Sequence, residues 1–263
     1  MNAIVCMKQV PDTETRFQVR DGAVVEEGIQ YVVNPYDEYA IEECLLKKEA
    51  DGEGKVTVIC LGSDRAREAI LQALALGCDQ AIHLNDPAFE GGDAFTTATA
   101  LAAAVKKAGE YDLIFTGKQG VDNDNAQVGI LLAEMLGLPH VSVVTRLDIA
   151  EDKSKATAQR EVEGGKQVVE TSLPAIFTAQ KGINEPRYPS FRGIRQAKRK
   201  PYTTWTAADL DLDPVTIGAA GAKSEMISVT LPPERGGGKV IEGEPAEAAQ
   251  ELVRLLRKEA KVI

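Results

Sequence analysis

The segment at residues 117–129, GKQGVDNDNAQVG, combines residue types that could bind an anion. It follows the apolar run Leu113–Phe115 and precedes a predicted helix whose apolar residues recur at helical spacing from Val128 to Met135. A strand, a polar loop and a helix start present backbone N–H groups without intrahelical partners, and the helix dipole adds about half a positive charge. Asp122 to Asn125 equally suit an ordinary capped turn. The pattern therefore predicts either a phosphate site or a plain strand-to-helix turn.

Other kinds of chemistry find little support in the sequence. No Gly-x-Gly-x-x-Gly motif follows a strand, so the dinucleotide fingerprint is absent. His83 and His140 have no Ser or Cys nucleophile beside them in a sharp turn, and we expect structural roles for both. The pair Asp122 and Asp124 could bind a metal or exchange protons, although such residues more often shape a loop. We therefore expect a cofactor-carrying or structural role and no stand-alone catalysis.

Charge and composition narrow the class of protein. The 263 residues carry a net charge of −10, which argues against nucleic-acid binding. No apolar run reaches about 18 residues, and the first residues lack the regions of a signal peptide. We therefore expect a cytoplasmic location and no membrane span. The four cysteines stand apart within apolar segments, which predicts buried thiols in a reducing compartment.

Strands and helices alternate in the first half of the sequence. Short apolar runs typical of buried parallel strands occur at residues 3–7, 56–61, 81–84 and 113–115. Predicted helices separate them and begin after Asn34, at Ser63 and near Asp93. This order predicts an α/β fold, with a twisted parallel sheet and helices on both faces. Ligands of such sheets bind beyond the carboxyl ends of the strands, here after Met7, Leu61 and Phe115.

The pattern changes after Pro139. Antiparallel strands are predicted at residues 142–144, 155–162 and 166–171, followed by a return strand at 174–178, an irregular stretch at 180–205, a short strand at 227–229 and a helix from 245 to about 258. The last helix has one apolar stripe, which needs a surface to pack on. We therefore expect an α/β domain at 1–200 with a small antiparallel insertion, and an extended arm at 201–263 that ends in a helix.

Several motifs together resemble the β subunit of the electron transfer flavoproteins. They are VCMKQVPD at 5–12, NPYDEYAIEE at 34–43, ALALGCD at 73–79, the loop at 117–129, AQREVEGG at 158–165, PAIFT at 174–178 and NEPRY at 184–188. The match covers most of residues 1–200, in order. It implies a Rossmann-like fold of the adenine-nucleotide-binding type.

The resemblance also implies an αβ heterodimer that carries single electrons. The donors would be flavin dehydrogenases, such as acyl-CoA dehydrogenases, and the acceptor a downstream quinone-linked oxidoreductase. The α subunit would hold FAD in a mobile domain, and this chain would bury an AMP with a structural role. Carried onto this sequence, the AMP contacts are Cys6, Asn34, Pro35, Tyr36, Asp37, Leu61, Gly117, Lys118, Gln119, Gly120, Val121, Asp122, Asn123, Asp124, Asn125, Ala126, Gln127 and Val128.

The family likewise suggests where partners contact this chain. Residues 180–200 resemble the loop that recognises partner dehydrogenases, with Phe191 as its apolar anchor. The expected partner contacts are Glu161, Tyr188, Phe191, Arg192 and Arg195, where Glu161 resembles a residue that meets the mobile flavin domain. The arm at 201–263 would pack on the α subunit.

A bifurcating branch of the family binds a second FAD in place of AMP and oxidises NADH. Its loop reads DGDTAQVGP, against DNDNAQVGI at residues 122–130 here. The Ala-Gln-Val-Gly half resembles that branch, whereas Asn123 for Gly and Ile130 for Pro do not. A bulky Asn123 restricts the backbone beside a diphosphate. We therefore expect AMP, with a second FAD as the alternative.

Overall fold

The computed structural model describes residues 1–233 and 237–263. Their contacts divide the chain into two units. The larger unit comprises Met1–Arg16 and Glu26–Ile227, and the smaller comprises Phe17–Val25 and Ser228–Ile263. Residues 234–236 of the predicted arm lie outside the described residues.

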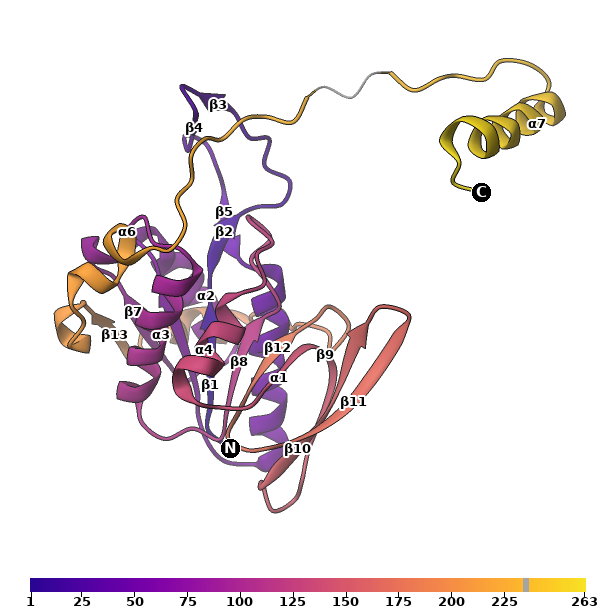
Figure 1. Cartoon of the computed structure of the whole chain (residues 1–263). Helices are drawn as coiled ribbons and strands as arrows, with labels where there is room; N and C mark the ends of the chain where they lie inside the picture. Colours follow the sequence, from indigo (N-terminus) through magenta and orange to yellow (C-terminus); the bar gives the residue numbers. More distant parts are fainter. Residues whose placement is uncertain (234–236) are drawn as a thin grey trace. The chain divides into compact units, whose positions relative to one another are not determined.

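One nine-stranded sheet forms the centre of the larger unit (Figure 1). Its strands, in spatial order, are β11 (Gly165–Ser172), β10 (Lys155–Val162), β9 (His140–Ile149), β12 (Ala175–Ala179), β8 (Leu113–Gly117), β1 (Ala3–Met7), β6 (Val56–Leu61), β7 (Gln80–Leu84) and β13 (Tyr202–Trp205). Strand β10 pairs antiparallel with both neighbours, and all other pairings are parallel. The predicted α/β fold with a small antiparallel insertion is confirmed.

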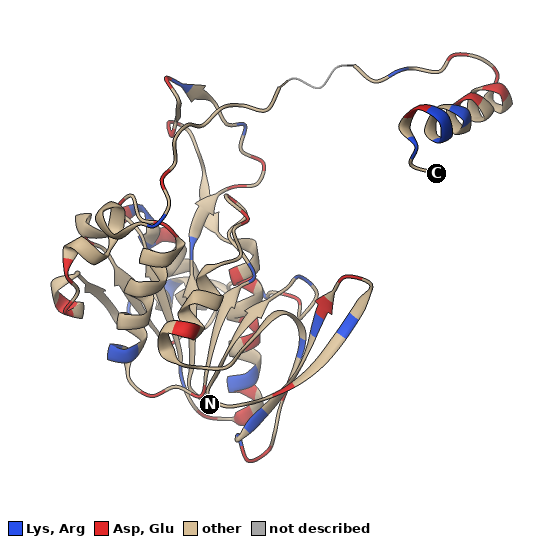
Figure 2. Cartoon of the chain, viewed as in Figure 1, with Lys and Arg blue, Asp and Glu red and all other residues tan. Residues whose placement is uncertain are grey.

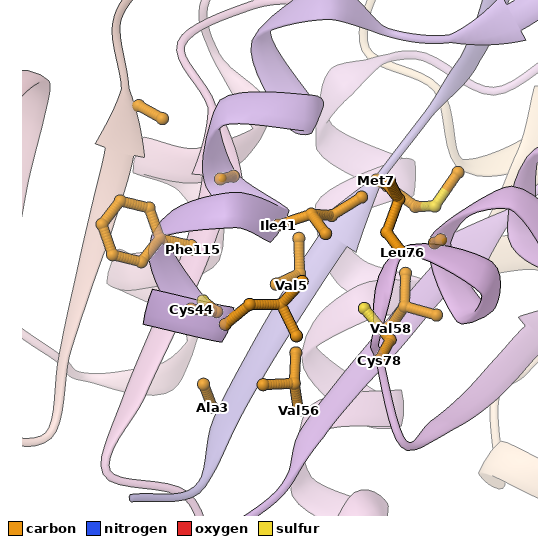
Figure 3. Close-up of a cluster of buried hydrophobic side chains, with 14 of the residues drawn as sticks. Ala3, Val5, Met7, Ile41, Cys44, Val56, Val58, Leu76, Cys78 and Phe115 are labelled. Atoms are coloured by element: carbon orange, nitrogen blue, oxygen red, sulfur yellow. The ribbon is translucent and has the colours of Figure 1, made fainter. Parts of the chain in front are cut away.

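Helices cover both faces of this sheet. They are α1 (Pro35–Asp51), α2 (Arg67–Leu76), α3 (Ala94–Ala108), α4 (Val128–Leu136), α5 (Phe191–Ala197) and α6 (Gly218–Gly221). Alternate residues of β1 serve opposite faces: Val5 belongs to the cluster with α1 and α2, and Ile4 to the cluster with α3 and α4. Figure 3 shows Val5 beside Ile41 and Cys44 of α1. Strands buried on both faces need continuous apolar runs, which is why their sequences do not alternate with polar residues.

Local signals explain several helix boundaries. Pro35 occupies the first turn of α1, where its missing N–H costs nothing, and Gly52 ends that helix in the left-handed conformation. Asp93 caps α3 and forms a capping box with Thr96. Short 3₁₀ segments occur at Asp64–Ala66, Pro87–Phe89, Ala208–Leu210 and Pro214–Thr216, and β2 (Gln9–Pro11) pairs with β5 (Tyr31–Val33) in a separate ribbon.

The four cysteines lie inside the larger unit. Cys6, Cys44, Cys60 and Cys78 are buried and free. Burial raises the pKa of the Cys60 and Cys78 thiols to about 12 and raises that of the other two as well.

Two expectations about secondary structure differ from the structure. The stretch 180–205 is not wholly irregular, because it contains α5 and β13, and β13 pairs with the distant strand β7. The strand expected at 227–229 is absent among the described residues, and Ile227 is 85% exposed with no neighbouring strand to pair with. The last helix, α7 (Pro245–Leu255), continues as a π turn over Leu256–Ala260, in agreement with the helix expected from 245 to about 258. The larger unit extends past residue 200, to Ile227.

The smaller unit has little internal structure. It contains the two-residue strands β3 (Val19–Arg20) and β4 (Ala23–Val24), and helix α7. Charged residues of both signs, among them Glu251 and Arg254, occur along α7 (Figure 2), and none of its residues is buried. Among the described residues, no helix has the length and apolar character needed to cross a membrane.

Candidate functional site

The site lies where the order of the central strands reverses. Strand β1 has β6 on one side and β8 on the other, so the chain moves outward in opposite directions from β1. The loops that follow these strands diverge at this point and leave a crevice beyond their carboxyl ends. The predicted loops after Met7, Leu61 and strand β8 therefore meet at one place.

Two buried side chains from the start of α1 hold the loop at 117–129. The Asn34 amide donates to the Gln119 carbonyl at 2.8 Å and accepts from the Val121 N–H at 3.1 Å. The Asp37 carboxylate accepts from the Lys8 N–H at 2.7 Å and the Gly117 N–H at 2.8 Å, which ties the ends of β1 and β8 together. The NPYD segment thus shapes the loop from behind.

Backbone N–H groups at the start of α4 face this crevice without a side-chain cap. Ala126 has φ +51°, and Gln127 has φ −107° and ψ −39°. Successive left- and right-handed residues turn their N–H groups toward one concavity, which favours an anion. Since α4 adds its own unpaired N–H groups and its dipole, this is the part of the site best suited to a phosphate.

A pocket of about 1140 Å³ opens in front of this loop. Of the predicted nucleotide contacts, the pocket is lined by Cys6, Asn34, Asp37, Leu61, Gly117, Lys118, Gln119, Gly120, Asn123, Asn125, Ala126, Gln127 and Val128. The others do not line it: Pro35, Tyr36, Val121, Asp122 and Asp124. Among these, Tyr36 packs against Gly117 of the lining.

Sequence reasoning missed a second wall of the pocket. Gly91 to Ala94, Thr97 and Leu101 come from the start of α3, and residues 219–226 contribute a further segment. The Gly-Gly-Asp sequence before a predicted helix was a usable signal for the first group, because glycines permit a close backbone approach. No local signal marked the second group, whose position depends on contacts distant in sequence.

The charges around the pocket are of both signs. Lys8 forms an ion pair with Asp122, and the Lys118 ammonium lies 5.2 Å from the centre of the Tyr36 ring. Burial raises the pKa of Asp37 to about 7, although the N–H groups of Lys8 and Gly117 act in the opposite direction. Among the described residues, no group of His, Cys, Asp and Glu side chains is arranged to hold a metal ion. The pocket therefore combines polar, charged and apolar groups that could bind a ligand.

The predicted partner residues lie in two other places. Glu161 is exposed on β10 and accepts a hydrogen bond from Gln180 at 2.9 Å. Tyr188 and Phe191 are 95% and 90% exposed, beside the exposed Arg192 and Arg195 of α5. The exposed segment 188–195 therefore presents an apolar pair with cations next to it.

This exposed segment is anchored at its start by Arg187. The Arg187 guanidinium donates to Glu42 at 2.8 and 3.0 Å and to Glu49 at 2.6 and 3.0 Å, and both glutamates belong to α1. The Arg187 N–H also donates to Glu42, at 3.2 Å. The hydrogen bonds from Arg187 lower the pKa of Glu49. At the other end, Lys200 donates to the Leu74 carbonyl at 2.8 Å. The segment is fixed at both ends while its apolar side chains stay in solvent.

Comparisons with known proteins agree on one family. The family model described as "Electron transfer flavoprotein domain" matches residues 21–210. The "Electron transfer flavoprotein subunit beta" of Bacillus subtilis is 42% identical over the full length of both chains. The protein of the same name from Megasphaera elsdenii is 38% identical over 93% of this chain and 92% of its own. The "Caffeyl-CoA reductase-Etf complex subunit CarD" of Acetobacterium woodii is 38% identical over 98% of each chain.

Proposed function

This chain belongs to the electron transfer flavoprotein family as a β subunit, and from that premise we propose that its pocket binds AMP as a structural ligand. As a β subunit it pairs with an α subunit, and the family's electron transfer involves flavin. We propose further that the α subunit holds most of the contacts to FAD, that acyl-CoA dehydrogenases or related flavoenzymes donate electrons, and that a quinone-linked oxidoreductase accepts them.

The observation that carries the AMP proposal is the uncapped start of α4, which faces the pocket. Its N–H groups and the turn at Ala126 and Gln127 suit a phosphate. Apolar side chains of Cys6, Leu61 and Leu101 line the same pocket and suit a nucleobase. The residues present thus fit an adenine nucleotide. Positive φ falls on Asp124 and Ala126 and not on Asn123, which lines the pocket.

The segment 188–195 supports the proposed docking of dehydrogenases. An exposed aromatic pair beside cations is a common arrangement at the centre of protein interfaces. The anchors at Arg187 and Lys200 hold the segment in one conformation, which reduces the entropy lost on binding. When bound, FAD supplies the redox chemistry, so this chain's own part is to bind, orient and dock.

A second FAD in place of AMP is the alternative ligand. The pocket of about 1140 Å³ exceeds the ~300–1,000 Å³ usual for a small ligand, which leaves room for a dinucleotide. The relative named for a caffeyl-CoA reductase–Etf complex adds weight to this alternative. In that case the chain would be the NADH-oxidising half of a bifurcating flavoprotein.

The test is a denaturing extraction of the co-expressed αβ complex, followed by chromatography for FAD and AMP. One FAD and one AMP per heterodimer is the expected result. Two FAD and no AMP would replace the AMP proposal with the bifurcating alternative. An absence of any adenine nucleotide beyond one FAD would refute the assignment of the pocket.

A further inference from the structure

Residues Ala219–Met226, called the strap below, form one wall of the nucleotide pocket. Five of its residues beyond α6 line the pocket: Ala222, Lys223, Ser224, Glu225 and Met226. The strap begins within α6 and runs toward Ser228, where the C-terminal part of the smaller unit begins. One continuous stretch of chain therefore leads from the pocket wall into residues 228–263, the last part of the arm that the family resemblance predicts to pack on the α subunit.

A single carboxylate joins the strap to helix α3. Asp93 caps α3 by accepting from the Thr96 N–H at 3.0 Å through Oδ1. Its other oxygen, Oδ2, accepts from the N–H groups of Lys223 at 2.7 Å and Ser224 at 2.9 Å, and from the Ser224 hydroxyl at 3.1 Å. Burial alone would raise the pKa of Asp93, but these hydrogen bonds outweigh it and lower the pKa to about 2. The carboxylate is therefore ionised at neutral pH and accepts all four bonds.

Other contacts fix only the beginning of the strap. The Ala219 N–H donates to the Glu90 carbonyl at 2.8 Å. Gly218, with φ +54°, approaches the Ala88 carbonyl so closely that an added Cβ would lie 2.2 Å from its oxygen. Within the described residues, Asp93 accepts every hydrogen bond that residues 222–226 donate. The strap is thus attached at its beginning by these close backbone contacts. Farther along it is held by the hydrogen bonds to Asp93 and by the Lys223 ammonium, which lies 5.3 Å from the centre of the Phe95 ring of α3.

The far end of the strap is apolar and exposed. Met226 and Ile227 are 78% and 85% exposed, immediately before residues 228–263 of the arm. Adjacent exposed apolar side chains at this point are suited to burial when the arm meets a partner. If a partner fixes the position of Ile227, it also restricts the pocket wall at Lys223, because only a few residues separate the two.

We propose that the strap couples nucleotide binding to α-subunit binding: Asp93 holds it against the nucleotide, docking of the arm orders it, and the two ligands bind with positive cooperativity. The inference rests on the proposed function. Because coupling between two binding equilibria is reciprocal, AMP should tighten the αβ complex by the same factor by which the α subunit tightens AMP binding.

The substitution Asp93→Asn separates the two roles of this residue. Asparagine caps helices about as well as aspartate, so Oδ1 still accepts from Thr96. The amide nitrogen in place of Oδ2 cannot accept from Lys223 or Ser224. A matched control is Asp213→Asn, since Asp213 caps the 3₁₀ segment Pro214–Thr216 and does not line the pocket.

The experiment measures AMP binding to the nucleotide-stripped αβ heterodimer by calorimetry, and the affinity of the two full-length subunits with and without AMP. In the wild-type protein, AMP should tighten subunit association. Asp93→Asn should weaken AMP binding roughly tenfold and remove that tightening, within the usual range of coupling between sites. Asp213→Asn should change neither quantity. Ser224→Ala removes only the hydroxyl donor, so a smaller loss of the same sign is expected and serves if Asp93→Asn does not fold.

The outcomes distinguish this inference from the proposed function. Wild-type affinity and wild-type coupling in Asp93→Asn would overturn the strap inference and leave AMP binding intact. If the wild-type heterodimer binds FAD and not AMP, the same comparison made with FAD decides the role of the strap. Binding of neither AMP nor FAD to the pocket would overturn both.

Discussion

Replacing Arg187 by methionine tests how the exposed segment 188–195 is anchored. Glu42 is nearly buried, with 6% of its side chain exposed, and it accepts three of the five hydrogen bonds that Arg187 donates. Arg187→Met leaves one backbone bond and strands a buried carboxylate, a change that costs about 3 kcal/mol in the free energy of unfolding. Glu49 is 54% exposed, so Glu49→Gln should cost less than about 1 kcal/mol, although it removes the negative charge and leaves one oxygen in place of two to accept from Arg187.

Urea unfolding of the purified chain, followed through its single tryptophan Trp205, measures these costs. The double variant Arg187→Met/Glu42→Gln should recover part of the loss, because the stranded charge is gone. A second readout is the KM for an electron-donating dehydrogenase, which should rise in Arg187→Met as the segment 188–195 loses its fixed conformation. A cost below about 1 kcal/mol for Arg187→Met would refute this reasoning. Equal costs for Arg187→Met and Glu49→Gln would also refute it, because the burial of Glu42 would then not determine the loss of unfolding free energy.

Three further changes test other parts of the structure. Phe191→Ala should raise the KM for a donor dehydrogenase roughly 30-fold, the effect of losing about 2 kcal/mol at an interface anchor, without changing the melting temperature, since Phe191 is 90% exposed. Steady-state electron transfer measures this, and an unchanged KM contradicts the docking claim. Gly117→Ala places a Cβ 2.4 Å from Asp37 Oδ1 and 2.7 Å from Tyr36 Cβ, so the loop at 117–129 must shift. The affinity for AMP should then fall about tenfold. An undiminished affinity in calorimetry would contradict the proposal that this loop binds the nucleotide. Burial raises the pKa of Asp37 to about 7 from 3.8, so the folded chain binds this proton more tightly than the unfolded chain and stability falls as pH rises between these values. Relative to Asp37→Asn, the wild-type chain should lose about 4 kcal/mol of unfolding free energy between pH 4 and pH 8; a constant difference in urea unfolding would refute this.

The central sheet could be predicted because its signals are local. Apolar runs such as Val56–Leu61 and capping residues such as Asp93 act within a few positions of the chain. Strand β13 could not be found in this way, since its YTTW sequence has exposed residues and becomes a strand by pairing with β7, more than a hundred positions earlier. The strand expected near Ile227 does not form, because even a suitable sequence needs a neighbouring strand to pair with.

The same division applies to the site. The loop at 117–129 could be predicted because it directly follows one strand and precedes one helix. The strap could not, since Lys223 and Ser224 are held at the pocket by contacts with Asp93 and Phe95, about 130 positions away. Neither residue type nor local spacing carries that information. Whether the pocket takes AMP or a second FAD, and which proteins dock at Phe191, stay predictions.

The burial of the four cysteines bears on how this subunit withstands oxidants. Peroxide attacks thiolates, and its rate depends on the fraction ionised and on access to solvent. With raised pKa values and no solvent contact, Cys60 and Cys78 have almost no thiolate near neutral pH. Cys6 follows the same rule, although it borders the pocket. Reduced flavins that meet oxygen release hydrogen peroxide, so a chain that works beside flavin is exposed to this oxidant throughout its life. The buried cysteines should therefore react very slowly with peroxide. Oxidation of the folded chain should begin at Met226, whose side chain is exposed.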